Sequence, residues 1–263
     1  MKLCYLATAS DEHARRWISY FVKKGYEVHM ISYVNAPLKG TTLHILPRFK
    51  NFYISFITGI ALIKRLISKI KPDILHVYST QGYAPRAAFS GFHPFIVTPY
   101  GSDVVIVPKC SKMIKWLTIY TLKIADVVIT DAEHMKDDLI SLGAAPEKIV
   151  HVNFGVDVLK FKPGSPNEEI KRQLNILGSP VVISLRTLEP LYDVKTLILA
   201  IPLVLKEVPD AKFVIAGKGS QEQKLKELAK SLGVWESVRF VGRIPHDALP
   251  EYLRCADVYV STA

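Results

Sequence analysis

Residues suited to anion chemistry stand directly after apolar runs in the second half of the chain. The segment "SLRTLEPLYD" places Arg186 at the end of one run, where a guanidinium suits bidentate contact with a phosphate. The segment "AGKGSQ" places Gly217 and Gly219 before a helical pattern, where backbone amides can bind an anion. The glycine turn is weak support by itself, but beside Arg186 it indicates an anion site.

A third segment of this kind is "FVGRIP". Its apolar run is followed by Gly242, Arg243 and Ile244. The exposed backbone of such a turn is suited to binding a planar base. In open sheets of parallel strands, ligands bind beyond the carboxyl ends of the strands. The residues that follow each predicted strand are therefore the candidates for chemistry.

The first half of the chain has three comparable segments. His13 lies in "TASDEHARRW", where arginines in the first turn of a helix oppose the helix dipole and favour an anion nearby. Gly101 and Asp103 lie in "TPYGSDV", and Asn153 and Gly155 lie in "VNFGVD". A surface histidine, a turn-forming aspartate and a turn where the chain leaves the domain are the plainer interpretations, and they stay open.

The sequence lacks the spacings of several common catalytic sites. It contains no Ser-His-Asp order, HExxH, Walker A or Asp-x-Asp pair, and no GxGxxG follows its first strand. Metal catalysis and acyl transfer are therefore not favoured. The three cysteines, Cys4, Cys110 and Cys255, are isolated from one another, which favours a reducing, cytoplasmic compartment.

Strand and helix patterns alternate along the chain, which predicts an α/β fold with parallel sheets. Strands are predicted over 2–8, 27–33, 42–47, 73–78, 95–100, 127–132, 149–154, 181–186, 212–217, 238–242 and 257–262. Helices are predicted over 11–24, 55–70, 112–125, 134–142, 194–207, 221–232 and 248–255. A Pro/Gly-rich segment at 158–180, which contains one short charged helix, separates two Rossmann-like domains, 1–165 and 166–263. The second has only four strands, so we expect it to be incomplete.

The net charge of +10 is uneven along the chain. Residues 1–165 hold 21 Lys/Arg and 12 Asp/Glu, whereas residues 166–263 hold 13 and 12. A basic first half favours an anionic partner, although a dispersed solvated surface has the same composition. The predicted helices 55–70 and 112–125 are apolar and basic together. They suit either peripheral contact with an anionic membrane, at its inner face, or simple packing on the sheet.

The sequence favours neither a nucleic-acid partner nor a location across a membrane. No recognised nucleic-acid-binding motif or interleaving of aromatic and basic residues is present. The longest apolar stretch, residues 53–63, is well short of the ~20 residues that span a bilayer.

Seven segments together give the chain a family resemblance. They are "HARRW…YFVKKGYEVHMIS", "KPDILHVYSTQG", "TPYGSDV", "VNFGVD…KFKP", "SLRTLEPLYDVKTLILA", "KFVIAGKGSQEQKLKELAKSLG" and "VRFVGRIPHDALPEYLRCADVYVSTA". In these the chain resembles the family 4 glycosyltransferases over its whole length. The resemblance implies the GT-B fold and transfer of a sugar from a nucleotide-sugar to a glycan or lipid-linked acceptor, with retention of configuration and without a metal cofactor.

The resemblance also assigns roles to residues. It implies a donor site on the second domain and an acceptor site on the first. Arg186 matches the arginine that holds the donor diphosphate, and Arg186 and Asp103 are the candidates for catalysis. The other donor-site candidates are Tyr192, Gly217, Gly219, Gly242, Arg243 and Ile244. The acceptor-side candidates are His13, Tyr100, Gly101, Asp103, Asn153 and Gly155.

The sequence departs from the family pattern in three places. Tyr192 stands near the position of a lysine beside the diphosphate, and Tyr100 stands where a histidine is frequent. The family's two glutamates in an E-x7-E spacing have no counterpart in this chain. We therefore expect a shortened form of a longer protein, with little activity by itself. The alternative is a non-catalytic nucleotide-sugar-binding or assembly module of the same fold.

Overall fold

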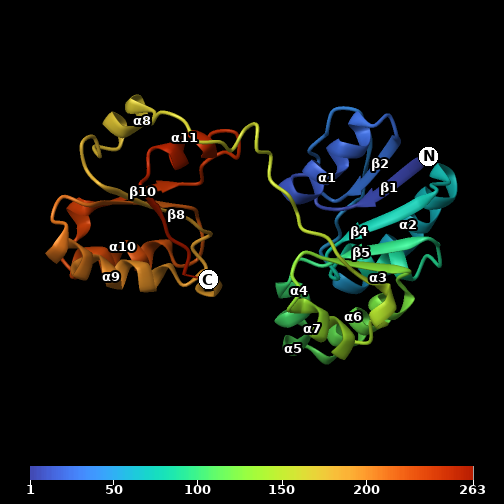
Figure 1. The fold of residues 1–263 in the computed structure, drawn as a ribbon. Coiled ribbons are helices and arrows are strands. Elements are labelled where there is room, and N and C mark those ends of the chain that lie inside the picture. The colour runs from blue at the N-terminus through green and yellow to red at the C-terminus, as the bar shows by residue number, and fades with distance from the viewer. Residues whose placement is uncertain (263) are drawn as a thin grey trace. The chain divides into compact units, whose positions relative to one another are not determined.

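The computed structural model describes residues 1–262 and divides the chain into two compact units (Figure 1). Unit 1 is Met1–Gly155, and unit 2 begins at Val156. This division comes earlier than the boundary predicted at residue 165. The reason for the earlier division is a local contact. Lys160 forms an ion pair with Asp247, and this ion pair holds the segment after Val156 against unit 2.

Unit 1 contains one parallel sheet of seven strands. The strands are β1 (Lys2–Leu6), β2 (Glu27–Ser32), β3 (Thr41–Ile45), β4 (Ile74–Tyr78), β5 (Phe95–Thr98), β6 (Val127–Thr130) and β7 (Ile149–His151). The longer helices are α1 (Glu12–Lys23), α2 (Phe52–Ile70), α6 (Lys112–Ile124) and α7 (Met135–Ser141). The strand order is β3-β2-β1-β4-β5-β6-β7. The seven strands predicted from the sequence are thus confirmed.

Unit 2 contains a second parallel sheet, with four strands in its described residues. They are β8 (Val181–Leu185), β9 (Lys212–Ala216), β10 (Val238–Gly242) and β11 (Val258–Tyr259). Its α-helices are α8 (Glu168–Gln173), α9 (Val194–Glu207), α10 (Glu222–Ser231) and α11 (Leu249–Arg254). The order β10-β9-β8-β11 repeats the order β3-β2-β1-β4 of unit 1. The prediction of two Rossmann-like parallel sheets is therefore confirmed.

The strands bury side chains on both faces, as parallel strands covered by helices do. In β1, Cys4 and Leu6 belong to one apolar cluster, whereas Leu3 and Tyr5 belong to another on the opposite face. Burial raises the pKa of Cys4 to about 12, because a thiolate is disfavoured in an apolar interior. Cys4 is therefore a packing residue and not a reactive thiol.

Three short helices were not predicted. They are α3 (Tyr83–Ala88), α4 (Ser102–Val105) and α5 (Val107–Cys110). Each is too short to show a helical period in the sequence, and α3 and α5 contain Pro85 and Pro108. None of the helices in residues 1–262, short or long, combines the length and apolarity needed to cross a membrane.

Aspartates join neighbouring strands at their amino ends in a repeated arrangement. Asp126 donates its N–H to the Phe95 carbonyl at 2.8 Å, and its carboxylate accepts the Phe95 N–H at 2.7 Å. The same reciprocal pairs join Asp73 with Lys2 and Asp257 with Val181. Each pair adds one step to the ladder between two parallel strands and so helps to fix their register.

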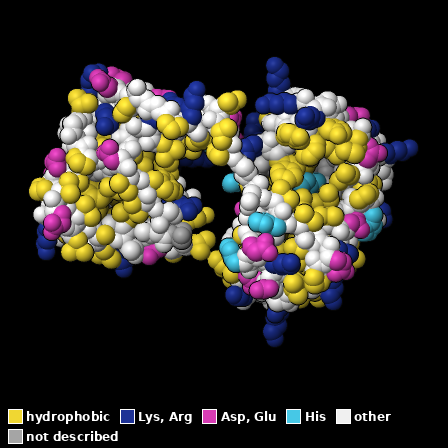
Figure 2. Space-filling model, in the orientation of Figure 1, with side chains coloured by type: hydrophobic (Ala, Val, Ile, Leu, Met, Phe, Trp, Pro, Cys, Tyr) yellow, Lys and Arg dark blue, Asp and Glu magenta, His cyan; other side chains and the backbone are white. Residues whose placement is uncertain are grey.

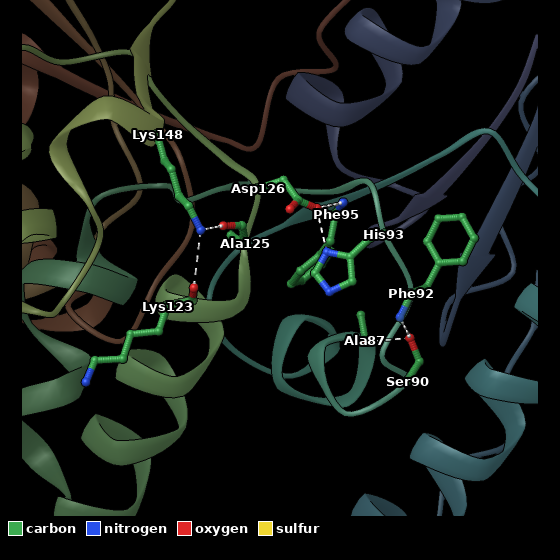
Figure 3. A network of polar contacts seen from close by, with 9 residues as sticks. All are labelled: Ala87, Ser90, Phe92, His93, Phe95, Lys123, Ala125, Asp126 and Lys148. Atoms are coloured by element: carbon green, nitrogen blue, oxygen red, sulfur yellow. Dashed lines mark hydrogen bonds and ion pairs between the residues drawn. The ribbon is translucent and has the colours of Figure 1, made fainter.

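Asp126 lies within a polar network (Figure 3). Its carboxylate is 2.7 Å from Nδ1 of His93 as well as from the Phe95 nitrogen. Close by, the Lys148 ammonium donates to the Ala125 carbonyl at 2.8 Å, which satisfies the C-terminal end of α6. Partial burial would raise the pKa of Asp126, but the hydrogen bonds from Phe95 and His93 outweigh it, so the pKa is lowered.

Replacing Asp126 by alanine leaves the buried Phe95 N–H without its acceptor. We expect Asp126→Ala to lower the free energy of unfolding by about 1–3 kcal/mol at neutral pH, as measured by chemical denaturation. The stabilisation is present above the unfolded-state pKa and is lost as the pH falls through the lowered folded-state pKa. Asp137→Ala, at an exposed aspartate of α7, is the matched control. Equal losses in the two variants would contradict the assignment.

Candidate functional site

Each sheet has a point at which the order of its strands reverses. It lies between β1 and β4 in unit 1 and between β8 and β11 in unit 2. Ligands of open parallel sheets bind beyond the carboxyl ends of the strands at such points. The residues that follow these strands are therefore the first candidates for ligand contact in each unit.

Arg186 follows β8 and lies at the reversal point of unit 2. Its Nε donates to the hydroxyl of Ser261, which follows the neighbouring strand β11, at 2.8 Å. Its guanidinium carbon lies 5.6 Å from the centre of the Tyr192 ring. These two contacts orient the side chain, while neither Nη group makes a hydrogen bond within residues 1–262. Both Nη groups can therefore donate to a phosphate.

Two glycines allow the loop after β9 to pass close to the loop after β8. A Cβ atom at Gly217 would lie 2.1 Å from the Arg186 carbonyl oxygen, and φ of Gly217 is +132°. A Cβ atom at Gly219 would lie 2.3 Å from the Leu188 carbonyl oxygen. Only glycine fits at these two positions. The glycine pattern therefore lets the loop after β9 pack against the backbone of Arg186 and Leu188.

The amides of this loop are not equally available to an anion. The Gly217 N–H donates to the Gly242 carbonyl at 2.7 Å, and the Ser220 N–H donates to the Glu189 carboxylate at 2.8 Å. The hydrogen bonds from the Ser220 hydroxyl and N–H lower the pKa of Glu189, which is therefore anionic at neutral pH. The N–H groups of Lys218 and Gly219 make no hydrogen bond within residues 1–262, so they are the ones left for a ligand.

The third predicted donor segment adjoins the other two. Gly242 ends β10 at a bulge with φ of +68°, and its carbonyl accepts the Gly217 N–H. Arg243 is exposed and Ile244 is half-buried. Within residues 1–262, no group of three His, Cys, Asp or Glu side chains is placed to hold a metal ion.

Six aromatic side chains form a closed ring of contacts at the reversal point of unit 1, and we call them the aromatic cluster. The distances between ring centres are 4.8 Å for His76–Tyr78, 6.0 Å for Tyr78–Tyr100, 6.3 Å for Tyr100–His13, 5.7 Å for His13–Phe154, 6.3 Å for Phe154–Trp17 and 6.1 Å for Trp17–His76. The members come from α1, from β4 and from the segments after β5 and β7. His76 and Tyr78 are buried, whereas the other four rings are at least partly exposed. The exposed rings offer a flat apolar surface of the kind that packs against the C–H face of a sugar ring.

Three polar side chains of the aromatic cluster, His76, Tyr78 and Tyr100, are neutral at physiological pH. Burial is the main cause that raises the pKa of both Tyr78 and Tyr100. Burial lowers the pKa of His76 to about 3, and its Nε2 lies 2.7 Å from the Thr98 hydroxyl. The Tyr78 hydroxyl is buried and has no partner within residues 1–262. Because buried polar groups are normally paired, this hydroxyl marks a place where a ligand oxygen can bind.

Asp103, one of the two residues predicted to be catalytic, lies at the carboxyl edge of the sheet of unit 1. It is buried, and its two carboxylate oxygens accept the Thr80 N–H at 2.6 Å and the Tyr100 N–H at 2.8 Å. Thr80 follows β4 and Tyr100 follows β5, so Asp103 joins two loops at the carboxyl edge of the sheet. This geometry favours a positioning role, in which Asp103 holds Tyr100 within the aromatic cluster.

The segment around Asn153 contributes one aromatic residue, Phe154, to the aromatic cluster. Asn153 and Gly155 are both exposed, and they form a tight turn in which the Gly155 N–H donates to the Asn153 carbonyl at 2.9 Å. Between them, Phe154 enters the aromatic cluster, and Arg16 Nη2 donates to its carbonyl at 2.9 Å. Gly101, with φ of +102°, forms the turn that precedes α4. Asn153, Gly155 and Gly101 therefore shape the backbone.

The sequence analysis missed Trp17, Tyr78 and Phe154. A signal for each exists in the sequence. Trp17 lies four residues after His13 and so shares its face of α1. Tyr78 is the last residue of β4, and Phe154 stands between two predicted site residues. Aromatic residues at the carboxyl ends of strands would have indicated the cluster.

Gly217→Ala tests the close approach of the two loops in unit 2. We expect the positive φ alone to lower the free energy of unfolding by about 1–3 kcal/mol, with a further loss because the new Cβ collides with the Arg186 carbonyl. Gly178→Ala is the matched control, because Gly178 has φ of +77° and no atom within 4 Å of its would-be Cβ. Urea denaturation compares the two variants. Equal losses would show that the loops are not packed as described.

Two family models match the chain, one in each unit. The model described as Glycosyl transferase 4-like matches residues 2–132. The model described as Glycosyl transferases group 1 matches residues 166–263. Together they cover most of the chain.

Curated relatives match over most of this chain but over less of their own length. The GDP-mannose-dependent alpha-(1-6)-phosphatidylinositol monomannoside mannosyltransferase of Mycobacterium tuberculosis is 27% identical over 179 residues, which is 67% of this chain and 46% of the relative. The alpha-monoglucosyldiacylglycerol synthase of Streptococcus pneumoniae is 28% identical over 200 residues, which is 74% of this chain and 42% of the relative. This chain thus corresponds to about half of either relative.

Solved structures share the fold. Anabaena HepE in complex with UDP-glucose has a TM-score of 0.80 at 17% identity and covers 100% of this chain and 74% of its own. WaaG, a glycosyltransferase involved in lipopolysaccharide biosynthesis, has a TM-score of 0.74 at 14% identity and covers 99% of this chain and 75% of its own. Identities this low show the fold alone, which is the GT-B arrangement of two parallel-sheet units. The two family models and this fold place the chain among the glycosyltransferases of the family 4 type.

Proposed function

We propose that the protein transfers a hexose from a nucleoside diphosphate sugar to a lipid-linked or glycan acceptor, with retention of configuration. The observation that carries the proposal is Arg186, whose Nε is held by Ser261 at 2.8 Å while both Nη groups remain free at the reversal point of unit 2. The GDP-mannose-dependent relative and the UDP-glucose complex of HepE support a nucleotide-sugar donor.

Arg186 and two amides are the groups proposed to assist departure of the diphosphate. When the bond between the anomeric carbon and the diphosphate oxygen breaks, negative charge collects on the leaving phosphate. The Nη groups of Arg186 and the N–H groups of Lys218 and Gly219 would donate to that charge, and donors already in place need no reorganisation. Because the guanidinium supplies positive charge and the amides add donor dipoles, the proposal includes no metal cofactor.

The acceptor is proposed to bind at unit 1. The aromatic cluster offers a surface for a sugar ring, and the unpaired Tyr78 hydroxyl offers a polar contact beside it. The two relatives named above act, by their names, on a phosphatidylinositol mannoside and form a diacylglycerol glycolipid. We therefore favour a lipid-linked acceptor, reached from the cytoplasmic face of a membrane.

Unit 1 has an exposed apolar patch that suits a lipid surface. Its members are Phe49, Phe52, Tyr53, Ile54, Ile57, Met113 and Trp116, which are 44–69% exposed. Ring contacts of Phe89 with Phe56 at 6.1 Å and with Trp116 at 6.4 Å connect α2 with α6. Exposed basic residues flank the apolar patch, namely Arg48, Lys50, Lys112 and Lys115. Figure 2 shows hydrophobic side chains interspersed with Lys and Arg at the surface. This combination favours an anionic membrane.

Arg186→Ala tests the donor site. We expect UDP and GDP to bind about tenfold to a hundredfold more weakly, because charge-assisted hydrogen bonds to phosphate are lost. Arg186→Lys should recover part of the affinity, since lysine is a point charge without the planar fork. Isothermal titration calorimetry measures the dissociation constants.

Arg172→Ala is the control for the donor site, because Arg172 is an exposed arginine of α8 in the same unit. Unchanged nucleotide affinity in a folded Arg186→Ala chain would contradict the proposal. Incubation with nucleotide-hexoses and lipid acceptors tests turnover. An α-linked product from an α-linked donor would support retention.

The double variant Tyr53→Ser/Ile57→Ser tests the apolar patch. We expect the unchanged chain to sediment with vesicles that contain phosphatidylglycerol, and the variant to bind them at least about tenfold more weakly, because two apolar side chains are lost. Leu203→Ser, at a 64% exposed residue of α9, is the control. Absence of vesicle binding would remove the membrane proposal, and self-association lost in the double variant would instead assign the patch to a second copy.

A further inference from the structure

A buried arginine without an ionic partner lies beside the apolar patch. Arg86 on α3 is 7% exposed, and no carboxylate lies within 4.0 Å of its guanidinium among residues 1–262. Its Nη1 donates to the Gly82 carbonyl, whereas its Nε is buried without a partner and its Nη2 makes no hydrogen bond in the same residues. An uncompensated buried cation is unfavourable, so a missing partner is indicated.

The surroundings of Arg86 are aromatic and basic. The rings of Phe56 and Tyr33 lie 4.9 and 5.9 Å from its guanidinium carbon. The Tyr33 hydroxyl is also buried without a partner in the described chain. Burial raises the pKa of Tyr33, and the charges of Arg86 and Arg48 oppose that rise. Arg48 follows β3, which pairs with β2, the strand that Tyr33 follows. Two cations and an unpaired hydroxyl together complement an anion.

Helix α2 leaves room for these two unpaired groups. Gly59 lies in the interior of α2, where glycine weakens a helix relative to alanine. A Cβ at this position would lie 2.7 Å from Arg86 Nε and 3.0 Å from the Tyr33 hydroxyl oxygen. Any larger residue would therefore displace Arg86 or Tyr33. The glycine keeps the space in which both groups stay close together.

The group lies at the same edge of the sheet as the aromatic cluster and continues into the apolar patch. Tyr33 follows β2 and Arg48 follows β3, whereas Arg86 lies on α3, the helix that comes after β4. The Phe56 ring, which faces Arg86, stacks on the ring of Phe52, a member of the apolar patch, at 5.9 Å. An anionic headgroup at Arg86 would therefore leave its acyl chains beside exposed apolar side chains.

We propose that Arg86, Arg48 and Tyr33 bind the phosphate of a phospholipid-type acceptor. Planar guanidinium groups suit the oxygens of a phosphate ester, and the Tyr33 hydroxyl supplies a further donor. This inference rests on the proposed function, because it identifies the chemical class of the acceptor. Free inorganic phosphate offers the same chemistry, so the experiment must separate the two sources.

Titration with inorganic phosphate and with a soluble short-chain phosphatidic acid tests the site. We expect Arg86→Met and Arg48→Met each to weaken binding of the short-chain lipid by at least about tenfold, because each removes a charge-assisted contact. Gly59→Ala should weaken it as well by displacing Arg86. Arg65→Met is the control, since Arg65 is an exposed arginine of the same helix α2.

Thermal unfolding without ligand separates binding from a structural role. Arg86→Met removes an unpaired buried charge, so its melting temperature should stay the same or rise. A lower melting temperature with unchanged lipid affinity would overturn the proposal, as would equal affinities in all variants. Inorganic phosphate that binds as tightly as the lipid would overturn the lipid assignment. UDP binding should be unchanged in Arg48→Met, and lipid binding should be unchanged in Arg186→Ala. The proposal for the lipid site and the proposal for the donor site can therefore be contradicted independently of each other.

Discussion

Reciprocal hydrogen bonds between an aspartate and the first residue of a neighbouring strand fix the geometry on which both candidate sites depend. Asp257 exchanges two such bonds with Val181 at the amino end of β8. At the other end of the same two strands, Arg186 reaches the Ser261 hydroxyl. A slip of one residue would turn every side chain of β11 to the opposite face and would separate this pair. The contact at the carboxyl edge therefore requires the register that the amino edge sets.

Much of this fold can be predicted from the sequence, because its signals are local. The apolar runs identify the strands, and the repeated order of strand and helix identifies parallel sheets. The aspartates also leave a signal, since each directly precedes an apolar run, in "PDIL", "ADVV" and "ADVY". The short helices α3, α4 and α5 leave none. They form where the chain turns at the carboxyl edge, and their conformation is set by tertiary contacts such as those of Asp103 with Thr80 and Tyr100.

The candidate sites likewise have some features that follow from the local sequence and others that do not. The position of Arg186 follows from the strand that precedes it, and the glycines of "AGKGSQ" follow from the close approach that a Cβ would prevent. The pairing of individual amides does not follow from local sequence. The Gly217 N–H is taken by Gly242 and the Ser220 N–H by Glu189, and both partners lie 25 or more residues away. The aromatic cluster likewise joins side chains from four separate segments, so spacing along the chain does not show it.

The distribution of unpaired polar groups links the two units to one kind of chemistry. At the amino edges of the sheets, the aspartates pair the first N–H groups of three strands. At the carboxyl edges, groups without a partner in the described chain remain, namely the Nη groups of Arg186, the N–H groups of Lys218 and Gly219, the Nε of Arg86 and the hydroxyls of Tyr78 and Tyr33. All of these groups can donate a hydrogen bond, and none is a carboxylate. Because folded proteins pair nearly all their buried polar groups, the buried donors of Arg86, Tyr78 and Tyr33 call for partners with acceptor oxygens. Phosphate esters and sugars are rich in such oxygens, and the exposed donors of Arg186, Lys218 and Gly219 in unit 2 suit the same chemistry. The proposed phosphorylated donor and the proposed phosphorylated acceptor therefore agree with the donors that each unit presents.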